Sequence, residues 1–371
     1  MSFDFSALSQ TIQKYRMDLH QIPEEGYEEF KTKAYLLKVL EPLNCTIHEV
    51  EPTGLVLYFD AGSDQTVAFR ADMDALPIQE QTGLTFASAH PGKMHACGHD
   101  GHMAILLGMA HYVNERLPEL TQNVVLVFQP SEEKEAGAMS IINSGLLDHY
   151  NVSAIYGLHL WPGLEAGIPF TRPNEFMAQS SETDIKIMGK SAHVASSWEG
   201  VDALHAAARF LGDVYSIEAS IKPEIYRLIK FGQIEAGTIR NILAGEAKLY
   251  GTVRSFYPQV QNRLKTIIED TAAKYEREFG CRFEIKYNDG YQAVINDEKL
   301  YEQAVKNNKA ISTLKRPVLQ AEDFGNYGAK YPALFFFLGV GATAPLHNEA
   351  FDFDMELLIK GVELFASLLE H

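Results

Sequence analysis

The sequence predicts an α/β fold with a central, mostly parallel sheet and flanking helices, interrupted by a smaller inserted α+β domain. Amphipathic stretches alternate with short apolar runs between residues 5 and 160, and several of these runs are apolar almost throughout. Such runs are typical of parallel strands that helices cover on both faces. The order of elements then changes near Ser181 and changes back after Gly290. A chain of 371 residues is long enough for two domains.

Residues 1–180 are expected to form the first part of the larger domain. A helical period predicts helices at residues 5–20, 28–43, 101–117 and 135–147. Apolar runs rich in β-branched and aromatic residues predict strands at residues 54–62, 66–72, 123–130 and 154–160. The last three of these are apolar until their final residues, so we expect them to be parallel and central.

Residues 181–290 are expected to form the inserted domain. Strands are predicted at residues 182–189, 226–234, 247–256 and 282–289, and helices at residues 200–219 and 259–280. The resulting order β-α-β-β-α-β is that of a ferredoxin-like unit. Residues 291–371 return to the first pattern, with a helix at 298–310, a strand at 332–341 and a closing helix at 354–370. They complete the larger domain.

Composition excludes several classes of function. The net charge of −17 disfavours nucleic acid or an anionic membrane as a partner. The first residues carry no cationic and apolar signal-peptide pattern, and the longest apolar run, near Ala333, is too short to span a bilayer. Three widely spaced cysteines suit the reducing cytoplasm better than a disulfide framework.

The stretch MHACGHDGH, residues 94–102, is the densest group of potential metal ligands in the chain. Cys97 and His99 are two residues apart, so an extended backbone would point both side chains to the same side. A helix is expected to begin near Gly101, with Asp100 as its N-cap. The histidine within that first helical turn, His102, is expected to be structural.

Polar residues also follow the predicted central strands. In an open parallel sheet, ligands bind beyond the carboxyl ends of the strands. The residues that arrive at this edge are Asp72, Asp74, Glu132, Glu133, His159 and His347. Their convergence with the cysteine and histidines of residues 94–102 predicts one functional site at this edge.

Thiolate, imidazole and carboxylate together favour Zn, Mn, Co or Ni over Ca or Mg. Four or five such ligands beside a further carboxylate suit one or two ions that activate water. One glutamate of the pair at 132–133 can bind metal while the other takes a proton. Two alternatives are a Cys97 nucleophile with His99 or His159 as its base, and a binding protein without catalysis. The first leaves the glutamate pair unused, and the second would be expected to have lost a ligand or the base.

Seven motifs in this order resemble the amidohydrolase branch of the aminoacylase/carboxypeptidase metallopeptidases. They are RADMDALP (70–77), MHACGHDGH (94–102), QPSEE (129–133), GLHLWP (157–162), GKSAHVA (189–195), AEDFG (321–325) and LHNE (346–349). The resemblance covers nearly the whole chain. It implies a catalytic domain with a zinc-exopeptidase-like sheet and an inserted lid and dimerisation domain, and thus a homodimer formed through the lid.

The resemblance also implies roles for individual residues. It gives a centre of two divalent ions per chain, Mn or Zn in the first place and otherwise Ni or Co. The ligands that it implies are Cys97, His99, Glu133, His159 and His347. Glu132 becomes the general base, and Asp74 orients a ligand. His193 on the lid contacts the scissile carbonyl, in some members from the partner subunit, while Asn241 and Arg254 bind the substrate's polar end.

The activity implied is hydrolysis of the amide bond of small N-acyl amino acids. The alternative within the same family is an aminopeptidase or dipeptidase that acts on free amino termini. The chain departs from the family at Trp198, where members often have a second lid histidine, and at Lys134 and Glu135, where a glycine-rich turn is usual. These departures leave the metal chemistry intact and leave the particular substrate open.

Overall fold

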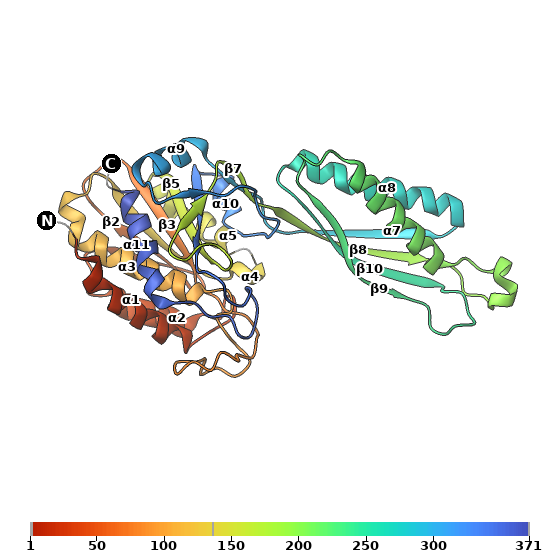
Figure 1. Ribbon diagram of the computed structural model, residues 1–371, viewed down its shortest axis with the longest axis horizontal. Coiled ribbons are helices and arrows are strands. Elements are labelled where there is room, and N and C mark those ends of the chain that lie inside the picture. Colours follow the sequence, from red (N-terminus) through yellow and green to blue (C-terminus); the bar gives the residue numbers. More distant parts are fainter. Residues whose placement is uncertain (1–2, 136, 370–371) are drawn as a thin grey trace. The chain divides into compact units, whose positions relative to one another are not determined.

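The computed structural model describes residues 3–135 and 137–369. The chain divides into two compact units, which are described separately. Unit 1 takes in Met1–Phe176, Ile295–Pro317 and Asp323–His371, and unit 2 takes in Met177–Val294 and Val318–Glu322. Both carry helices on β-sheet (Figure 1).

Unit 1 is built on an eight-stranded mixed sheet in the order β1-β2-β4-β3-β5-β14-β6-β13. The strands are β1 (Thr46–Val50), β2 (Gly54–Phe59), β3 (Thr66–Asp72), β4 (Asn123–Gln129), β5 (Val152–Trp161), β6 (Pro169–Thr171), β13 (Ser312–Thr313) and β14 (Ala333–Gly339). The four central strands β4, β3, β5 and β14 are parallel to one another. The prediction of a mostly parallel central sheet is therefore confirmed.

The central strands are buried on both faces, as is typical of parallel strands that helices cover. Every residue of β3, β4 and β14 is buried, as the unbroken apolar runs predict. Strand β2 pairs antiparallel with β4, and β1 pairs antiparallel with β2. The antiparallel strands therefore extend one side of a parallel centre.

Helices α1 (Phe5–His20), α3 (His99–Arg116) and α11 (Leu358–Ser367) pack against one another, and α3 contacts β3, β4 and β5 (Figure 1). Helix α2 (Phe30–Leu40) also contacts α3. Short helices contact other strands: α5 (Ala138–Asn143) contacts β2 and β4, and α10 (Gly325–Gly328) contacts β14. The remaining helices of unit 1 are α4 (Glu132–Glu135), α6 (Leu146–His149) and α9 (Glu298–Asn307).

Two helix predictions need correction. The helix predicted at 135–147, in which residue 136 lies outside the described part, is two short helices, because Gly145 takes a left-handed φ of +72° between them. Asp100 is not an N-cap. Helix α3 begins at His99 after Gly98, whose φ is +84°, and the Asp100 carboxylate instead contacts buried Arg16 and His20 at 3.1 and 2.8 Å.

Unit 2 is a four-stranded antiparallel sheet in the order β11-β8-β10-β9, with two helices packed on it (Figure 1). The strands are β8 (Gln179–Met188), β9 (Leu228–Ala236), β10 (Glu246–Ser255) and β11 (Arg282–Asp289), and the helices are α7 (Ala203–Ser220) and α8 (Pro258–Phe279). Buried and more exposed residues alternate along β8, as in a sheet with one covered face. The predicted ferredoxin-like order is confirmed. Strands β7 (Asn174–Met177) and β12 (Val294–Asn296) form a separate pair.

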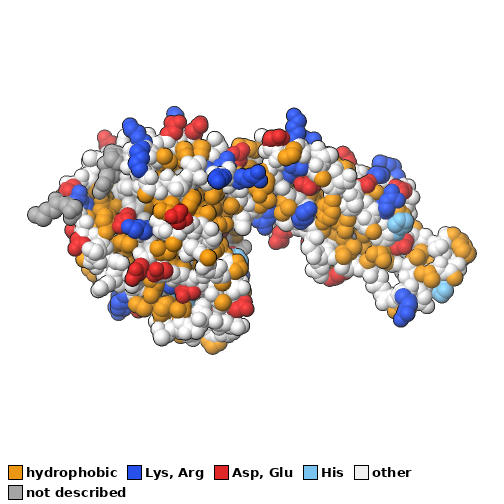
Figure 2. All heavy atoms as spheres, viewed as in Figure 1, with side chains coloured by type: hydrophobic (Ala, Val, Ile, Leu, Met, Phe, Trp, Pro, Cys, Tyr) orange, Lys and Arg blue, Asp and Glu red, His pale blue; other side chains and the backbone are white. Residues whose placement is uncertain are grey.

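None of the helices in the described part of the chain combines the length and the apolar character that crossing a bilayer requires. The short 3-10 helix η2 (Val194–Glu199) lies in unit 2, and it exposes Val194 and Trp198, the latter to 78%. Figure 2 shows hydrophobic side chains gathered at the end of unit 2 where this segment lies.

Candidate metal centre

The carboxyl ends of the four adjacent strands β4, β3, β5 and β14 carry the polar residues that the sequence places there. Asp72 ends β3, His159 lies near the end of β5, and Glu132 and Glu133 open α4 just after β4. His347 follows β14 in a loop, where its backbone N–H donates to the carbonyl oxygen of Ala96 at 2.9 Å. This bond ties His347 to the segment that carries Cys97. The predicted convergence is present within unit 1.

The side chains form two groups that share Cys97. Its Sγ lies 3.3 Å from His159 Nε2 and 3.3 Å from His347 Nε2. Glu133 Oε1 lies 3.0 Å from His347 Nε2 and 4.0 Å from His99 Nε2. In the groups Cys97–His99–His159 and Cys97–Glu133–His347, the potential ligand atoms lie within 4.8 Å of one another. Each group has the mutual spacing that a shared cation requires.

Backbone carbonyls fix the tautomers of two of these histidines. His99 Nδ1 donates to the carbonyl oxygen of Asp74 at 2.8 Å, and His159 Nδ1 donates to that of Leu160 at 2.7 Å. A carbonyl can only accept, so each Nδ1 carries a proton, and in the neutral ring each Nε2 presents a lone pair to the cluster. His99 Nε2 is buried and has no hydrogen-bond partner within the described residues. This orphaned lone pair is what a metal ion would satisfy.

His102 is arranged differently, because both of its ring nitrogens are engaged. The Leu160 N–H donates to His102 Nε2 at 2.9 Å, and His102 Nδ1 donates to Asp72 Oδ1 at 2.6 Å. Its ring therefore joins β5 to β3 and has no lone pair left for an ion.

Cys97 and His99 come together for a reason other than the one predicted. The backbone there is not extended. It turns at Gly98, whose φ of +84° lies in the left-handed region, and enters α3 at His99. A glycine adopts this conformation without steric cost. The turn brings Cys97 and His99 into one cluster, as expected, through a local geometry that spacing alone does not reveal.

Asp74 organises the glutamate pair. Its Oδ1 accepts from the Glu132 N–H and its Oδ2 from the Glu133 N–H, each at 3.0 Å. The carbonyl of the same residue accepts from His99. Asp74 therefore holds one histidine and both glutamates of the cluster, and its side chain acts on the glutamate backbone rather than on a histidine ring alone.

The two glutamates have different partners. Glu133 Oε1 faces His347 and His99. Glu132 is 6% exposed, and its Oε1 accepts from the Asp323 N–H at 3.3 Å. Glu132, Glu133 and His99 also form a group whose potential ligand atoms lie within 4.8 Å of one another. Both carboxylates are therefore close to the histidine cluster, and Glu132 has a separate backbone donor as well.

The cluster contains an excess of buried carboxylate charge, which shifts the pKa values of its members. Burial raises the pKa of the Cys97 thiol well above its usual value, and the Glu133 carboxylate raises it further. Burial lowers the pKa of His99, but the Asp72 and Asp74 carboxylates outweigh this effect and raise it to about 10, so a bound cation would take the place of the proton at Nε2. Excess buried negative charge of this kind is stabilised by a bound cation. The donor set of sulfur, imidazole nitrogen and carboxylate oxygen therefore fits a transition-metal ion.

Sequence reasoning missed a buried network behind the cluster. Arg70 donates to Asp72 Oδ2 and to Asp323 Oδ1, each at 2.7 Å, and to Gln129 Oε1 at 2.9 Å. Asp323 Oδ2 also accepts from the Ala138 N–H at 2.9 Å. An arginine within the otherwise apolar strand 66–72 was the available signal, because a buried guanidinium needs partners.

The predicted lid residues belong to unit 2, where they lie at two places. His193 forms an isolated bridge with Ile242, and the Val194 N–H donates to the Asn241 carbonyl oxygen at 3.1 Å, so His193 and Asn241 are neighbours. Arg254 lies beside Ser180, at the other end of β10, and donates to the Leu319 carbonyl oxygen at 2.8 Å. Eight residues of strand separate Arg254 from Glu246, which is roughly 26 Å.

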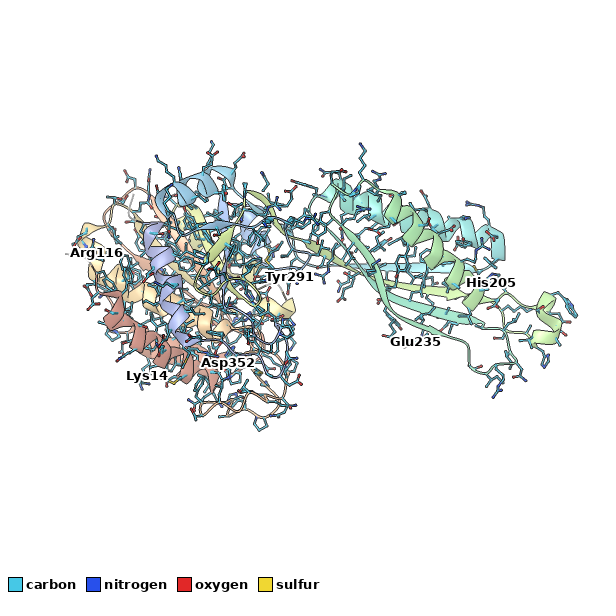
Figure 3. The ribbon with its side chains drawn as sticks, viewed as in Figure 1. Lys14, Arg116, His205, Glu235, Tyr291 and Asp352 are labelled. Atoms are coloured by element: carbon cyan, nitrogen blue, oxygen red, sulfur yellow. The ribbon has the colours of Figure 1, made fainter. Side chains whose placement is uncertain are left out.

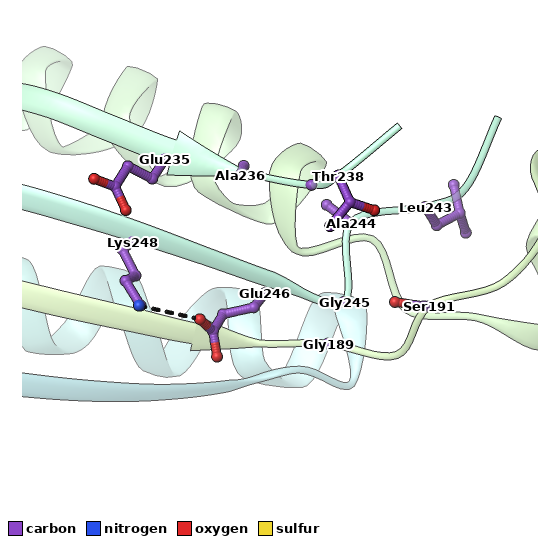
Figure 4. Close-up of a pocket in the computed structure, with 11 residues that line it drawn as sticks. Gly189, Ser191, Glu235, Ala236, Thr238, Leu243, Ala244, Gly245, Glu246 and Lys248 are labelled. Carbon is purple, nitrogen blue, oxygen red and sulfur yellow. Dashed lines mark ion pairs between the residues drawn. The ribbon is translucent and has the colours of Figure 1, made fainter. Parts of the chain in front are cut away.

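A pocket of about 460 Å³ lies at the His193 end of unit 2 (Figure 4). Its lining includes Ser191, Glu235, Glu246 and Lys248, and Lys248 pairs with Glu246 at 3.4 Å. Figure 3 places Glu235 on β9 and His205 on α7. The lining residues do not include His193, Asn241 or Arg254, so this pocket is separate from the predicted lid contacts.

A sheet whose strand ends gather thiol, imidazole and carboxylate groups, with a further buried carboxylate beside them, has the residues that a metal-dependent hydrolase requires. The chain belongs to the peptidase family M20/M25/M40, whose family model matches residues 68–371. It is 37% identical over 370 residues to N-acetyldiaminopimelate deacetylase of Streptococcus pneumoniae (strain 70585), a match that covers 96% of this chain and 97% of that one. It is 36% identical to the enzyme of the same name from Limosilactobacillus fermentum, with 96% of each chain covered.

Among solved structures, the fold is similar to that of the Bacillus subtilis YXEP protein, described as a dinuclear metal binding peptidase from M20 family. The TM-score is 0.86, the identity is 31%, and 98% of each chain is covered. The family resemblance predicted from the seven motifs is confirmed.

Proposed function

We propose that this protein is a metal-dependent amidohydrolase that removes the acyl group from small N-acyl amino acids. One observation carries the proposal. Cys97 belongs to two potential ligand groups, and Glu132 forms a further group with His99 and Glu133 in which the potential ligand atoms lie within 4.8 Å of one another. Glu132 also accepts from the Asp323 N–H. Metal ligands with a further buried carboxylate beside them are what hydrolysis by activated water requires.

Two divalent ions fit the donor set. We assign as their ligands Cys97, His99, Glu133, His159 and His347. Mn or Zn suits these ligands best, with Ni or Co as further options. Bound ions would lower the pKa of water at the site and polarise the scissile carbonyl.

Glu132 is the general base in this proposal. Its carboxylate takes a proton from the attacking water and passes it to the leaving nitrogen, which cannot depart unprotonated. Burial excludes bulk water from the group, and the Asp323 N–H fixes one of its oxygens. Asp74 fixes the backbone from which Glu132 and Glu133 extend.

The lid residues act on the substrate, and we infer that a second copy of the chain takes part. His193 contacts the scissile carbonyl, while Asn241 and Arg254 bind the substrate's polar end. The strand from Glu246 to Arg254 spans roughly 26 Å, and His193 and Asn241 lie past its Glu246 end, where the Leu243 N–H donates to the Ala192 carbonyl oxygen. An extended N-acyl amino acid spans only about 7 Å. One small substrate therefore cannot meet His193 and Arg254 of the same chain.

A homodimer through unit 2 would resolve this distance. Strand β9 is an edge strand, and its backbone can pair with another strand. Ile234 on β9 and Leu204 and Ile217 on α7 are exposed apolar residues of this unit. We propose that β9 and α7 form the dimer contact, with His193 and Asn241 supplied by the partner.

Cys45 and Cys281 are free thiols, which suits the cytoplasm, where we place the enzyme.

The relatives named N-acetyldiaminopimelate deacetylase make an N-acetyl amino acid the first substrate to test. The Mn- and Zn-loaded protein should be assayed with N-acetyl-, N-benzoyl- and N-succinyl-amino acids and with unblocked dipeptides. We expect hydrolysis of an N-acyl amino acid that a chelator abolishes. Faster cleavage of unblocked dipeptides than of the matching N-acetyl amino acids would favour an aminopeptidase or dipeptidase instead.

A further inference from the structure

The turn that presents Glu132 and Glu133 is held by buried carboxylates at three consecutive backbone N–H groups. Asp74 accepts from the last two, as described above. The first belongs to Ser131, whose N–H donates to Glu29 Oε1 at 2.9 Å. Glu29 lies far away in sequence, at the start of α2, and no motif singled it out.

Ser131 needs such a restraint because its backbone is unfavourable. Its φ is +50°, in the left-handed region, which is unfavourable for a residue other than glycine. Gly26 packs closely against the Ser131 side chain. A Cβ added at Gly26 would lie only 2.4 Å from Ser131 Oγ. The Ser131 carbonyl also accepts from the Gly137 N–H at 3.0 Å. The turn is thus closed by contacts from several directions.

Glu29 is free to act on Ser131 because it does not cap its own helix. It occupies the N-cap position of α2 but makes no side-chain capping bond. Glu24 does that work instead, accepting from the Lys31 and Thr32 N–H groups at 2.8 and 3.0 Å. The second oxygen of Glu29 accepts from the Thr53 hydroxyl at 2.5 Å.

Keeping a carboxylate in this place is costly. Glu29 is 0% exposed, and burial raises its pKa while the Thr53 hydroxyl acts in the opposite direction. A buried carboxylate is stable only where hydrogen bonds compensate for lost water. Its two donors, the Thr53 hydroxyl and the Ser131 N–H, hold it in place.

We propose that Glu29 is a positioning residue for the general base: by holding Ser131 in its left-handed conformation, it sets the direction in which Glu132 leaves the backbone. This inference rests on the proposed function, in which Glu132 is that base. Glu29 touches neither the substrate nor the proposed ligands.

The test combines five variants with metal analysis, steady-state kinetics and amide hydrogen exchange. Glu29→Leu removes the acceptor, Glu29→Gln keeps a neutral one, and Glu24→Leu is the matched control, since it removes a buried carboxylate from the same segment without touching Ser131. Ser131→Gly, alone and combined with Glu29→Leu, tests the route, because glycine adopts a positive φ without penalty.

We expect Glu29→Leu to lower kcat about tenfold or more, because misplacement of a catalytic group by about 1 Å costs up to 10²-fold, with KM and metal per chain unchanged. Glu29→Gln should retain most activity. Adding Ser131→Gly to Glu29→Leu should raise kcat at least about threefold above that of Glu29→Leu alone. Exchange at residues 131–135 should speed up in Glu29→Leu and not in Glu24→Leu.

Unchanged exchange at residues 131–135 in Glu29→Leu would overturn the inference. So would wild-type kcat in that variant, or a loss of activity that Ser131→Gly fails to restore and that Glu24→Leu reproduces. The exchange comparison does not depend on turnover. A wild-type protein that hydrolyses no N-acyl amino acid would therefore reject the proposed function, while exchange would still decide whether Glu29 holds Ser131.

Discussion

Replacing Asp74 by asparagine changes a single oxygen of the cluster to nitrogen and leaves its size the same. The carboxylate is buried and accepts from the Glu132 and Glu133 N–H groups, each at 3.0 Å. An amide can accept only one of these bonds, and its NH₂ group then faces the other N–H, donor against donor. The remaining bond also loses its assistance from charge.

The cost follows from these two changes. A hydrogen bond to a charged group contributes roughly 1.5–3 kcal/mol, and a neutral one about 1 kcal/mol. Losing one bond and weakening the other should therefore destabilise the protein by about 3 kcal/mol, which is within the ~5–15 kcal/mol of a typical domain. The protein should stay folded while Glu132 moves, and kcat should fall about 10²-fold.

Urea unfolding of the chelated protein would measure the free energy of unfolding, and kcat would be measured on the reloaded enzyme. Asp202→Asn is the matched control. Asp202 also accepts from two N–H groups, at 3.0 and 3.1 Å, but at the exposed start of α7, where asparagine caps about as well as aspartate. A loss of less than about 1 kcal/mol in Asp74→Asn, together with nearly normal kcat, would refute the reasoning.

Three further predictions concern other parts of the molecule. Cys97→Ser should lower the metal content per chain, because a hydroxyl is a much poorer ligand than a thiolate; full loading by elemental analysis would contradict the assignment. His193→Ala should lower kcat by about 10²-fold, as for loss of a donor to the transition state, with metal content unchanged; undiminished turnover would remove the lid from the mechanism. Burial lowers the pKa of His20, but the hydrogen bond to Asp100, the Asp100 charge and the hydrogen bond to Glu80 together outweigh it and raise the pKa to about 9. Because the folded pKa is the higher one, this stability is fully present below about pH 6.5 and is lost as the pH rises through 9. Urea titrations between these limits should show that slope in the wild type and not in His20→Gln.

The parts of the fold that the sequence predicted well are those set by local pattern. Strands β3, β4 and β14 are buried at every residue, and an unbroken apolar run can be recognised without knowledge of neighbours. Helix α1 spans the predicted residues 5–20, and its N-cap Asp4 accepts from the Ser6 and Ala7 N–H groups. Strand β1 was missed, because polar residues interrupt it and only Val50 is buried, so that only pairing with β2 defines it.

The candidate site divides in the same way. Residues at strand ends were found because sheet topology brings those ends together. The turn at Gly98 was not predicted, because it depends on the positive φ of a single residue. Arg70, Asp323 and Glu29 were also missed as partners. Each makes its contact with a residue distant in sequence, such as Ser131 for Glu29, and neither spacing nor composition records such a contact.

The central claim is that Glu132 moves the proton while Glu133 binds metal. Metal per chain and kcat, measured together in Glu132→Gln and Glu133→Gln, test it most directly. Glu132→Gln keeps the side chain's shape, so metal should remain bound while kcat falls by about 10²–10⁴-fold. Glu133→Gln replaces a charged ligand by a neutral amide and should lose metal. Metal lost from Glu132→Gln and kept in Glu133→Gln would reverse the two roles, and a fully active Glu132→Gln would contradict the mechanism.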